Sequence, residues 1–547
     1  MNKSSQLEVN YWYEGRCPFS GELLRLPRTR ESEAIAMELM QELSQLDLQL
    51  QQIPNKPTTK FFVKAPLRGA FTKNLVLVCS QSAASNYFRN TMSEASHYWI
   101  INARIPNCFI DISLRERETL LAPTLQRDRL FACHLEINNG RIAQIIANSQ
   151  DSLAQIPTES LAIVDAKQGM IIPCFVDLHT HLDKGHIWER SPNLDGTFEG
   201  ALKGIDKDCT EDGNWHYEDL YRRMEFGLKC SYAHGTKAIR THLDCPPHQF
   251  ETTLQVFSEL REQWKDRITL QAVSLVSLSY FDTPDGEKFA DAIANVGGIM
   301  GGIAHMAPEF EKYLSSIFRL ATERNLCLDF HTDETDDPQS QTLRRVAAAA
   351  LEHDFKAQIV CGHCCSLATQ DQETAETAIA LIKEANIGIV SLPMCNLYLM
   401  DRVADRTPRW RGVTLAKELD ANSVKVAISS DNCRDPFHGF GDHDMLQVFS
   451  MGTKILHLDT PYDNWIESVT SRPASLMGLS DFDENMGKIE IGQAADLVLF
   501  KARSYSELLS RPQSDRLVFR DGIAIDRNLP DYSELDDLIF GTAPCNK

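Results

Sequence analysis

Residues 169–184 read GMIIPCFVDLHTHLDK, an apolar segment that ends in two histidines separated by one residue. The apolar part has the length and composition of a buried parallel strand. Because side chains alternate between the two faces of a strand, His179 and His181 point to the same side. Strands that are apolar until their last residues are typical of barrels, whose sites lie where the strand ends meet. The stretch therefore predicts a barrel strand with a polar site at its end.

Seven further apolar segments follow at regular spacing, with amphipathic helical patterns between them. The eight expected strands are residues 169–179, 236–244, 268–277, 297–306, 326–334, 357–365, 387–396 and 424–432. Helical spacing is clear in residues 310–324 and 373–384. This alternation predicts a (β/α)8 barrel over residues 169–460. An open doubly wound sheet is the alternative fold, but it usually has a glycine-rich first turn where this chain has histidines.

Both flanks of the expected barrel show strand patterns, including a hairpin around Asn138-Asn139-Gly140. We expect residues 98–168 and 461–547 to form one small β-sandwich assembled from both ends. Residues 1–97 are expected to form an N-terminal α/β extension, with an amphipathic helix over 31–53 and two strands within 60–79. We interpret the extension as a packing or oligomerisation element, which leaves a homo-oligomer open.

Composition excludes several classes of protein. The 547 residues are 43% hydrophobic and 24% charged, which is typical of a globular chain and not of a disordered or fibrous one. The net charge of −21 opposes binding to nucleic acid or to an anionic membrane. No apolar run is long enough to span a membrane. Because the 15 cysteines are scattered and no signal peptide is evident, we expect a cytoplasmic protein with reduced thiols.

Polar side chains end most of the expected strands. Five of the eight strands end in histidine, a frequency that isolated structural histidines do not explain. His179 and His181, together with His331 and Asp431, offer three neutral nitrogen donors and one carboxylate. Such a set suits Zn²⁺ or Fe²⁺, with a position left open for water, and does not choose between the two metals. Ser277 and Asn396 end two of the remaining strands.

These motifs resemble the amidohydrolase superfamily, and within it the cytosine-deaminase-like branch. The resemblance covers about residues 98–526 and is carried by the opening stretch, LDFHTDE at 328–334, VCGHCC at 360–365 and ISSDN at 428–432. It implies the metal ligands His179, His181, His331 and Asp431, the proton carrier Glu334, and His363 as the group that orients the attacking water. Two-metal relatives use a lysine or glutamate on strand four. Residues 297–306 contain neither, so the resemblance implies one divalent ion per chain.

The resemblance implies hydrolytic deamination of cytosine or a related nitrogen heterocycle, with release of ammonia. Asp431 would accept a proton from water whose pKa the metal lowers, and Glu334 would protonate a ring nitrogen. His363 would stabilise the developing charge. One alternative is removal of an alkylamine from an s-triazine-like ring. Another is a metal-binding pseudoenzyme, which would not need to keep Glu334, His363 and Asp431 together.

A small heterocycle is the expected partner. The residues expected to bind it are Thr197, Ser277, His305, Asn432 and Phe437. Cytosine deaminases of this branch have a glutamine where this chain has Ser277, and a second aspartate where it has Asn432. We therefore expect cytosine to be a mediocre substrate and another flat ring to pack on Phe437.

Three further residues near the expected site receive other roles. His242 and Asp244 are expected to be structural neighbours of the metal centre. His186, on the loop after the first strand, is expected to face solvent or substrate rather than to act as a ligand.

Overall fold

The computed structural model of the protein describes residues 96–110, 127–149, 151–157, 161–462, 464–480, 486–512 and 515–541, together with four N-terminal strands. The chain divides into two compact units, Met1–Ser96 and His97–Lys547. In the first unit, β1 (Tyr11–Arg16) pairs antiparallel with β2 (Leu23–Pro27), and β3 (Lys60–Val63) with β4 (Leu75–Val78). The pair β3–β4 confirms the two strands predicted within 60–79. The helix predicted over 31–53 lies outside the described residues.

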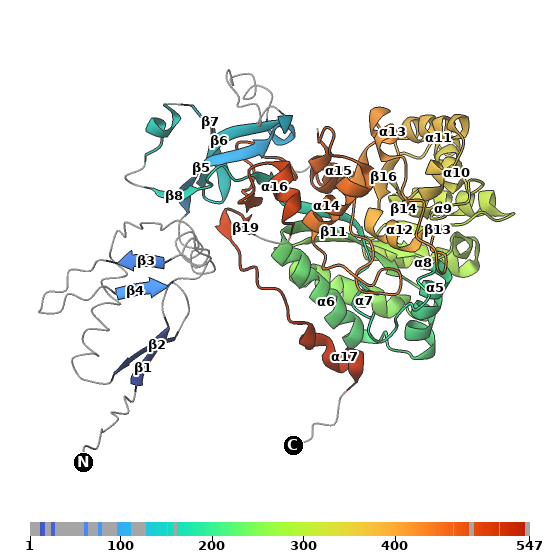
Figure 1. Ribbon diagram of the computed structural model, residues 1–547. Coiled ribbons are helices and arrows are strands. Elements are labelled where there is room, and N and C mark those ends of the chain that lie inside the picture. The colour runs from blue at the N-terminus through green and yellow to red at the C-terminus, as the bar shows by residue number, and fades with distance from the viewer. Residues whose placement is uncertain are drawn as a thin grey trace, which may run out of the picture. The chain divides into compact units, whose positions relative to one another are not determined.

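Eight parallel strands form the centre of the second unit (Figure 1). They are β10 (Phe175–Thr180), β11 (Thr236–Asp244), β12 (Thr269–Leu275), β13 (Met300–Ala304), β14 (Leu328–Thr332), β15 (Ile359–His363), β16 (Gly388–Ser391) and β17 (Val426–Ile428). Hydrogen-bonded ladders join β10 through β12 and β13 through β17. Backbone bridges join the two groups at both edges, at Val273↔Ile299 and at Thr180↔Asp431. The strands therefore follow one another around a closed ring, and the predicted (β/α)8 barrel is confirmed.

Helices lie over the outer wall of the barrel or beside its mouth. They are α5 (Phe198–Asp206), α6 (Tyr217–His234), α7 (Phe250–Trp264), α8 (Pro284–Asn295), α9 (Phe310–Arg324), α10 (Thr342–Glu352), α11 (Gln372–Glu384), α12 (Pro393–Leu399), α13 (Ala416–Ala421), α14 (Met445–Leu456) and α15 (Ser471–Leu476). Local chemistry sets their ends. The carboxylate of Asp371 accepts the backbone N–H of Thr374 and caps α11. Gly235 ends α6 in the left-handed conformation that glycine adopts without strain.

Two expected strands differ from the structure. Residues 169–179 contain two strands, because β9 (Ile171–Pro173) pairs with a strand of the flanking sheet while β10 enters the barrel. Pro173, which has no N–H to donate, ends the first of them. The strand expected over 387–396 ends at Ser391, because Pro393 begins α12, where its missing N–H costs nothing. Asn396 consequently lies on a helix.

The flanking strands form two four-stranded sheets. One has the order β7 (Arg141–Ala147), β6 (Leu130–Asn138), β5 (His97–Pro106), β8 (Ala162–Asp165). The other has the order β20 (Ile523–Ala524), β19 (Arg516–Arg520), β18 (Leu497–Phe500), β9. The Tyr98 hydroxyl donates to the Gly522 carbonyl at 2.6 Å and so links the two sheets. At the predicted hairpin, Gly140 has a φ of 77°, and a Cβ there would lie 2.7 Å from the Asp521 carbonyl oxygen. The domain boundaries stay a prediction.

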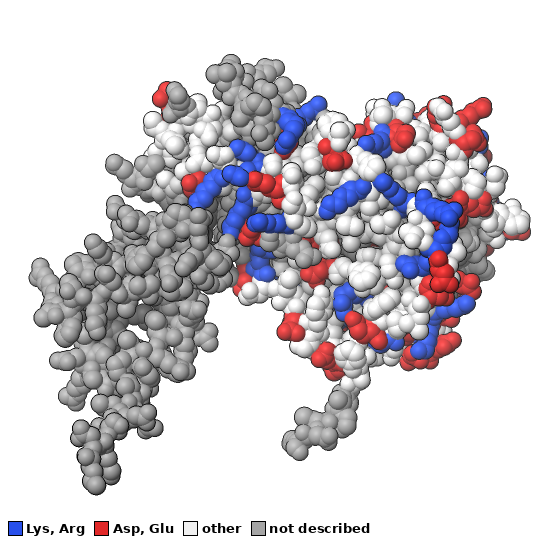
Figure 2. Space-filling model, viewed as in Figure 1, with Lys and Arg blue, Asp and Glu red and all other residues white. Residues whose placement is uncertain are grey.

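The C-terminal segment returns to the barrel. Helix α16 (Tyr505–Ser510) precedes β19, and α17 (Asp536–Phe540) lies beside α6 (Figure 1). Leu535 packs there with Phe226 and Cys230, and Arg222 pairs with Asp537 at 2.7 Å. Basic and acidic side chains are interspersed over the barrel face seen in Figure 2. No helix in the described part of the chain has the length and apolar character needed to cross a membrane.

Candidate metal centre

The four residues predicted as metal ligands lie together at one mouth of the barrel. His179 is on β10 and His331 on β14, while His181 and Asp431 follow the first and last strands. The Asp431 Oδ1 atom lies 3.3 Å from His181 Nε2 and 3.6 Å from His179 Nε2. The His331 and His181 Nε2 atoms are 3.4 Å apart. All four side chains are buried. The barrel therefore brings together residues that are far apart in the chain.

The backbone at the barrel seam holds Asp431 in place. Its φ of 62° is in the left-handed region, which a non-glycine residue occupies only when the surroundings impose it. Its N–H donates to the His179 carbonyl at 2.9 Å, and its own carbonyl accepts the Thr180 hydroxyl at 2.9 Å. The same hydrogen bonds that close the barrel therefore set the position of the carboxylate relative to the first strand.

The chemistry of these side chains fits a divalent cation. Within the described residues, both ring nitrogens of His179 and the Nδ1 atoms of His181 and His331 have no hydrogen-bond partner, and the Asp431 oxygens accept none from an N–H or O–H group. Burial lowers the pKa of all three histidines well below its ordinary value, so the rings are neutral donors. A tetrahedral ion with bonds of about 2.0–2.2 Å separates its ligand atoms by roughly 3.3–3.6 Å, close to the spacing here.

Glu334 and His363 lie beside the cluster and share a hydrogen-bond partner. The Glu334 Oε1 atom is 3.2 Å from His363 Nδ1. The Asn396 amide donates to that same Nδ1 at 3.0 Å and to Glu334 Oε1 at 3.3 Å. With Nδ1 accepting, the proton of the neutral His363 ring is on Nε2, which has no partner in the described part of the chain. Asn396 thus positions both side chains, a role that its expected place at a strand end did not reveal.

Burial shifts both groups toward their uncharged forms. Burial, assisted by the nearby Asp431 carboxylate, raises the pKa of Glu334 well above its ordinary value. Burial lowers the pKa of His363 to about 3. Burial also raises the pKa of Asp431 to about 7. A carboxylic acid that keeps its proton beside a neutral imidazole is suited to donating that proton to a bound molecule.

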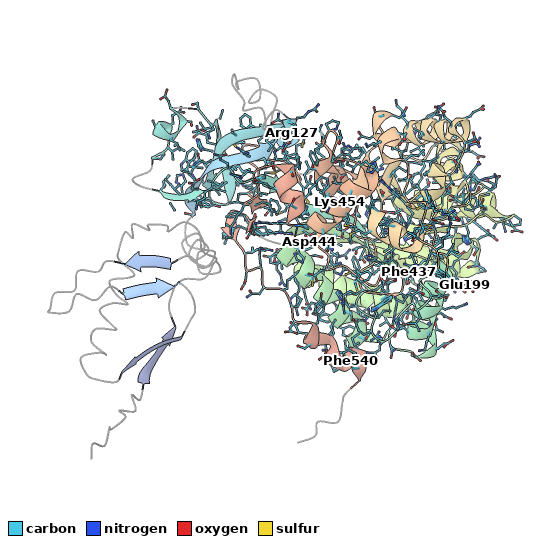
Figure 3. All side chains as sticks on the ribbon, viewed as in Figure 1. Arg127, Glu199, Phe437, Asp444, Lys454 and Phe540 are labelled. Carbon is cyan, nitrogen blue, oxygen red and sulfur yellow. The ribbon has the colours of Figure 1, made fainter. Side chains whose placement is uncertain are left out.

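A cavity of about 1050 Å³ opens over the cluster, and all five predicted substrate-binding residues line it. Phe437 lies between α5 and α12 (Figure 3) and packs edge-on against Phe198, with ring centroids 5.5 Å apart. His305 is exposed at the cavity wall. The Ser277 hydroxyl is 2.9 Å from that of Ser279.

The other two predicted substrate-binding residues have hydrogen bonds within the protein. The Asn432 amide donates to Asp435 Oδ2 at 2.8 Å. The Thr197 hydroxyl donates to Asp195 and accepts the Gly200 N–H, so it caps α5. For all five residues, substrate binding stays a prediction.

Lys184 and Asp244 form a charged pair on the cavity wall that the sequence analysis did not assign to the substrate. The Lys184 Nζ atom is 3.0 Å from Asp244 Oδ1 and 4.8 Å from the centroid of the Phe437 ring. Burial lowers the pKa of Lys184, but the surrounding carboxylates outweigh that effect, and the net shift is upward. The side chain is therefore an ammonium group. The sequence signal that places Lys184 near the site is its position five residues after His179, directly beyond the end of the strand.

His242 and His186 have different surroundings. The His242 ring stacks on His179 with centroids 3.8 Å apart, so it lies beside the predicted ligands. The expectation for His186 is wrong. Its side chain is buried and is not among the described residues that line the cavity. Its backbone N–H donates to the Cys433 carbonyl, and its ring lies against Phe226.

Comparisons with known proteins identify the family and several relatives of this chain. The model of the amidohydrolase family matches residues 225–522. A pterin deaminase from Rhizobium rhizogenes (strain K84 / ATCC BAA-868) is 50% identical over 382 residues, covering 69% of this chain and 86% of the relative. An N-isopropylammelide isopropyl amidohydrolase from Pseudomonas sp. (strain ADP) is 27% identical over 355 residues, covering 62% and 82%. The structure of 5-methylcytosine deaminase from Klebsiella pneumoniae liganded with 5-fluorocytosine has a TM-score of 0.66 at 25% identity, covering 79% of this chain and 98% of that chain.

Proposed function

The chain belongs to the amidohydrolase family, and from that premise we propose that it is a metal-dependent hydrolytic deaminase that acts on a pterin. The observation that carries the proposal is the position of the Glu334 carboxyl, 3.2 Å from His363 and beside a cluster of four potential metal ligands. The choice of a pterin is supported by the 50% identity to a pterin deaminase over most of that protein's length.

The residues of the site divide the proton transfers between them. His179, His181, His331 and Asp431 would hold the cation, which when bound supplies a Lewis acid and lowers the pKa of water toward ~7. Asp431 accepts one proton of the attacking water. Glu334 donates its proton to the ring nitrogen beside the amino-bearing carbon as the new carbon–oxygen bond forms. His363 donates its Nε2–H to the oxygen that becomes negative, which lowers the energy of the transition state.

The second half of the reaction restores both carboxyl groups. The proton held on Asp431 passes to the amino group, the carbon–nitrogen bond breaks, and ammonia leaves. The remaining hydroxyl proton returns to Glu334, and a ring carbonyl remains. Both protons of the water are thereby accounted for, one in ammonia and one on Glu334, while the original Glu334 proton stays on the ring nitrogen.

The cavity offers suitable contacts for a fused bicyclic ring. Small-molecule pockets generally measure ~300–1,000 Å³, so this cavity of about 1050 Å³ accommodates more than a single pyrimidine. The Phe437 ring provides a face for stacking. The Lys184 ammonium can donate to a ring carbonyl, and the Asp244 carboxylate can accept from a ring N–H or amino group.

Removal of an alkylamine from an s-triazine-like ring is the second candidate function. It is favoured by the likeness to the Pseudomonas amidohydrolase and by apolar side chains in the cavity wall. These are Leu202, Ile205, Met400 and Val403.

A substrate panel tests the proposal. We expect the purified full-length protein to release ammonia from pterin with a higher kcat/KM than from cytosine, because Ser277 and Asn432 replace the residues that cytosine deaminases use. N-isopropylammelide and 5′-deoxyadenosine complete the panel, and alkylamine is measured alongside ammonia. Glu334→Gln is the control for background hydrolysis. Turnover of cytosine above that of pterin, or release of alkylamine alone, contradicts the proposal.

A further inference from the structure

A second group of potential metal ligands lies outside the catalytic cluster. His186, Cys433 and His443 have ligand atoms within 4.8 Å of one another. Their exposed fractions are 3%, 1% and 2%. None of the three belongs to the four-residue cluster, and none is among the described residues that line the cavity.

We propose that His186, Cys433 and His443 bind a second divalent cation of zinc-like chemistry, which holds structure rather than substrate. The two Nε2 atoms are 3.3 Å apart, close to the 3.4 Å between the corresponding atoms of His181 and His331. Two imidazoles and one cysteine sulfur are ligands that zinc prefers. Burial raises the pKa of the Cys433 thiol, so its proton would leave as the metal binds. This ion would be additional to the single ion predicted in the catalytic cluster.

The two imidazole rings are otherwise poorly provided with partners. The Nδ1 atoms of His186 and His443 have no hydrogen-bond partner within the described residues. Burial lowers the pKa of His443 to about 4 and that of His186 well below its ordinary value, so both rings are neutral. A hydrogen bond between them would use one N–H and one lone pair. A cation instead engages both facing nitrogens and the sulfur at once.

Two glycines leave space around the ligand atoms. Gly227 lies inside α6, where glycine is unfavourable. A Cβ at that position would lie 3.1 Å from His443 Nε2 and 2.9 Å from Leu182 Cδ2. A Cβ at Gly441 would lie 3.3 Å from Cys433 Sγ, and the φ of 105° there also favours glycine. Ligand atoms of the group are therefore among the close neighbours of both glycines.

The C-terminal segment encloses the group. The Phe226 ring lies 4.8 Å from that of His186, and Tyr532 stacks on Phe226 at 5.7 Å. The Tyr532 hydroxyl donates to Asp442, the residue before His443. A cation here would therefore connect the loop after β10 to the loop after β17. The C-terminal segment would lie over it. Those loops also carry His181 and Asp431.

Cobalt substitution of the full-length protein tests the proposal. None of the four predicted catalytic ligands is a sulfur atom, so a thiolate-to-Co²⁺ charge-transfer band in the near ultraviolet that disappears in Cys433→Ser reports on the second site. We expect the band in the wild-type protein and in Cys174→Ser, which removes a buried thiol between β9 and β10. We expect its loss in Cys433→Ser. Absence of the band from the Co²⁺-loaded wild-type protein overturns the proposal, whether or not the variants fold.

Elemental analysis of the zinc-loaded protein gives a second readout. We expect the wild-type protein to hold about one more equivalent of zinc than Cys433→Ser or His443→Asn. An unchanged zinc content in both variants overturns the proposal. Because neither residue belongs to the catalytic cluster, failure of this test leaves the proposed deaminase function standing.

Discussion

Replacing Glu334 with glutamine removes the transferable proton while changing little else. Gln has nearly the same volume as Glu, and its amide oxygen can still accept the Asn396 N–H, which lies 3.3 Å from Glu334 Oε1. The side chain is only 13% exposed, so no water is expected to replace the lost acid easily. General acid–base catalysis contributes ~10²–10⁴-fold to a rate. At 1.36 kcal/mol per tenfold, the barrier should rise by about 3–5 kcal/mol.

The assay separates proton transfer from metal binding. We expect kcat for ammonia release to fall by that factor, with KM for the heterocycle within a few-fold of the wild-type value and the metal content unchanged. Glu323→Gln is the matched control, because Glu323 is on the outer surface of α9 and its side chain is 48% exposed. Parallel loss of metal and activity in Glu334→Gln would show that the carboxylate is a ligand. An unchanged kcat would show that another group supplies the proton.

Three further predictions concern the ligands, the positioning amide and the scaffold. His331→Ala should lose metal and activity together, and activity that persists after the metal is lost, as measured by elemental analysis, would contradict the ligand assignment. Asn396→Ala should lower kcat by about 10- to 100-fold and alter the pH profile of kcat, because the buried groups it serves lose a hydrogen bond; an unaltered pH profile would reduce its role to packing. Arg516→Met removes the two guanidinium hydrogen bonds, at 2.7 and 2.8 Å, from the buried Asp444 carboxylate, which keeps the hydrogen bond from the Leu446 N–H, and should lower the free energy of unfolding in urea by about 3–5 kcal/mol. Arg503→Met removes a surface ion pair and should change the free energy of unfolding little. Equal losses of stability in Arg503→Met and Arg516→Met would contradict this prediction.

The barrel and the proximity of the four candidate ligands could be predicted because their signals are local. The alternation of His179 and His181 along a strand and the position of His331 at a strand end follow from the strand pattern itself. What could not be predicted depends on contacts between distant segments. The inward turn of His186 involves a hydrogen bond to the Cys433 carbonyl, which belongs to the loop after the last barrel strand and is distant in sequence.

Two other differences between the expected and the observed elements have local signals in the sequence, but these signals are weaker. Pro173 lies where the chain passes from one sheet to another. The residues on both sides of it are apolar, however, and this pattern predicts a single strand. Pro393 reads equally as the end of a strand or the first turn of a helix, and so Asn396 was expected on the wrong element. The shared hydrogen bonds of Asn396 appear only once the strands are arranged around the ring.

The seam between Thr180 and Asp431 joins positions 251 residues apart in the chain. During translation, His179 and His181 are therefore synthesised long before Asp431, which completes the set of four potential ligands. Until then the nascent chain can offer a passing metal ion only an incomplete set of ligands. Under the proposed ligand assignment, metal loading and catalytic competence are therefore late events in biosynthesis. A truncated product that ends before the last barrel strand should be recognisable by its inability to retain the ion, however well its earlier strands have folded.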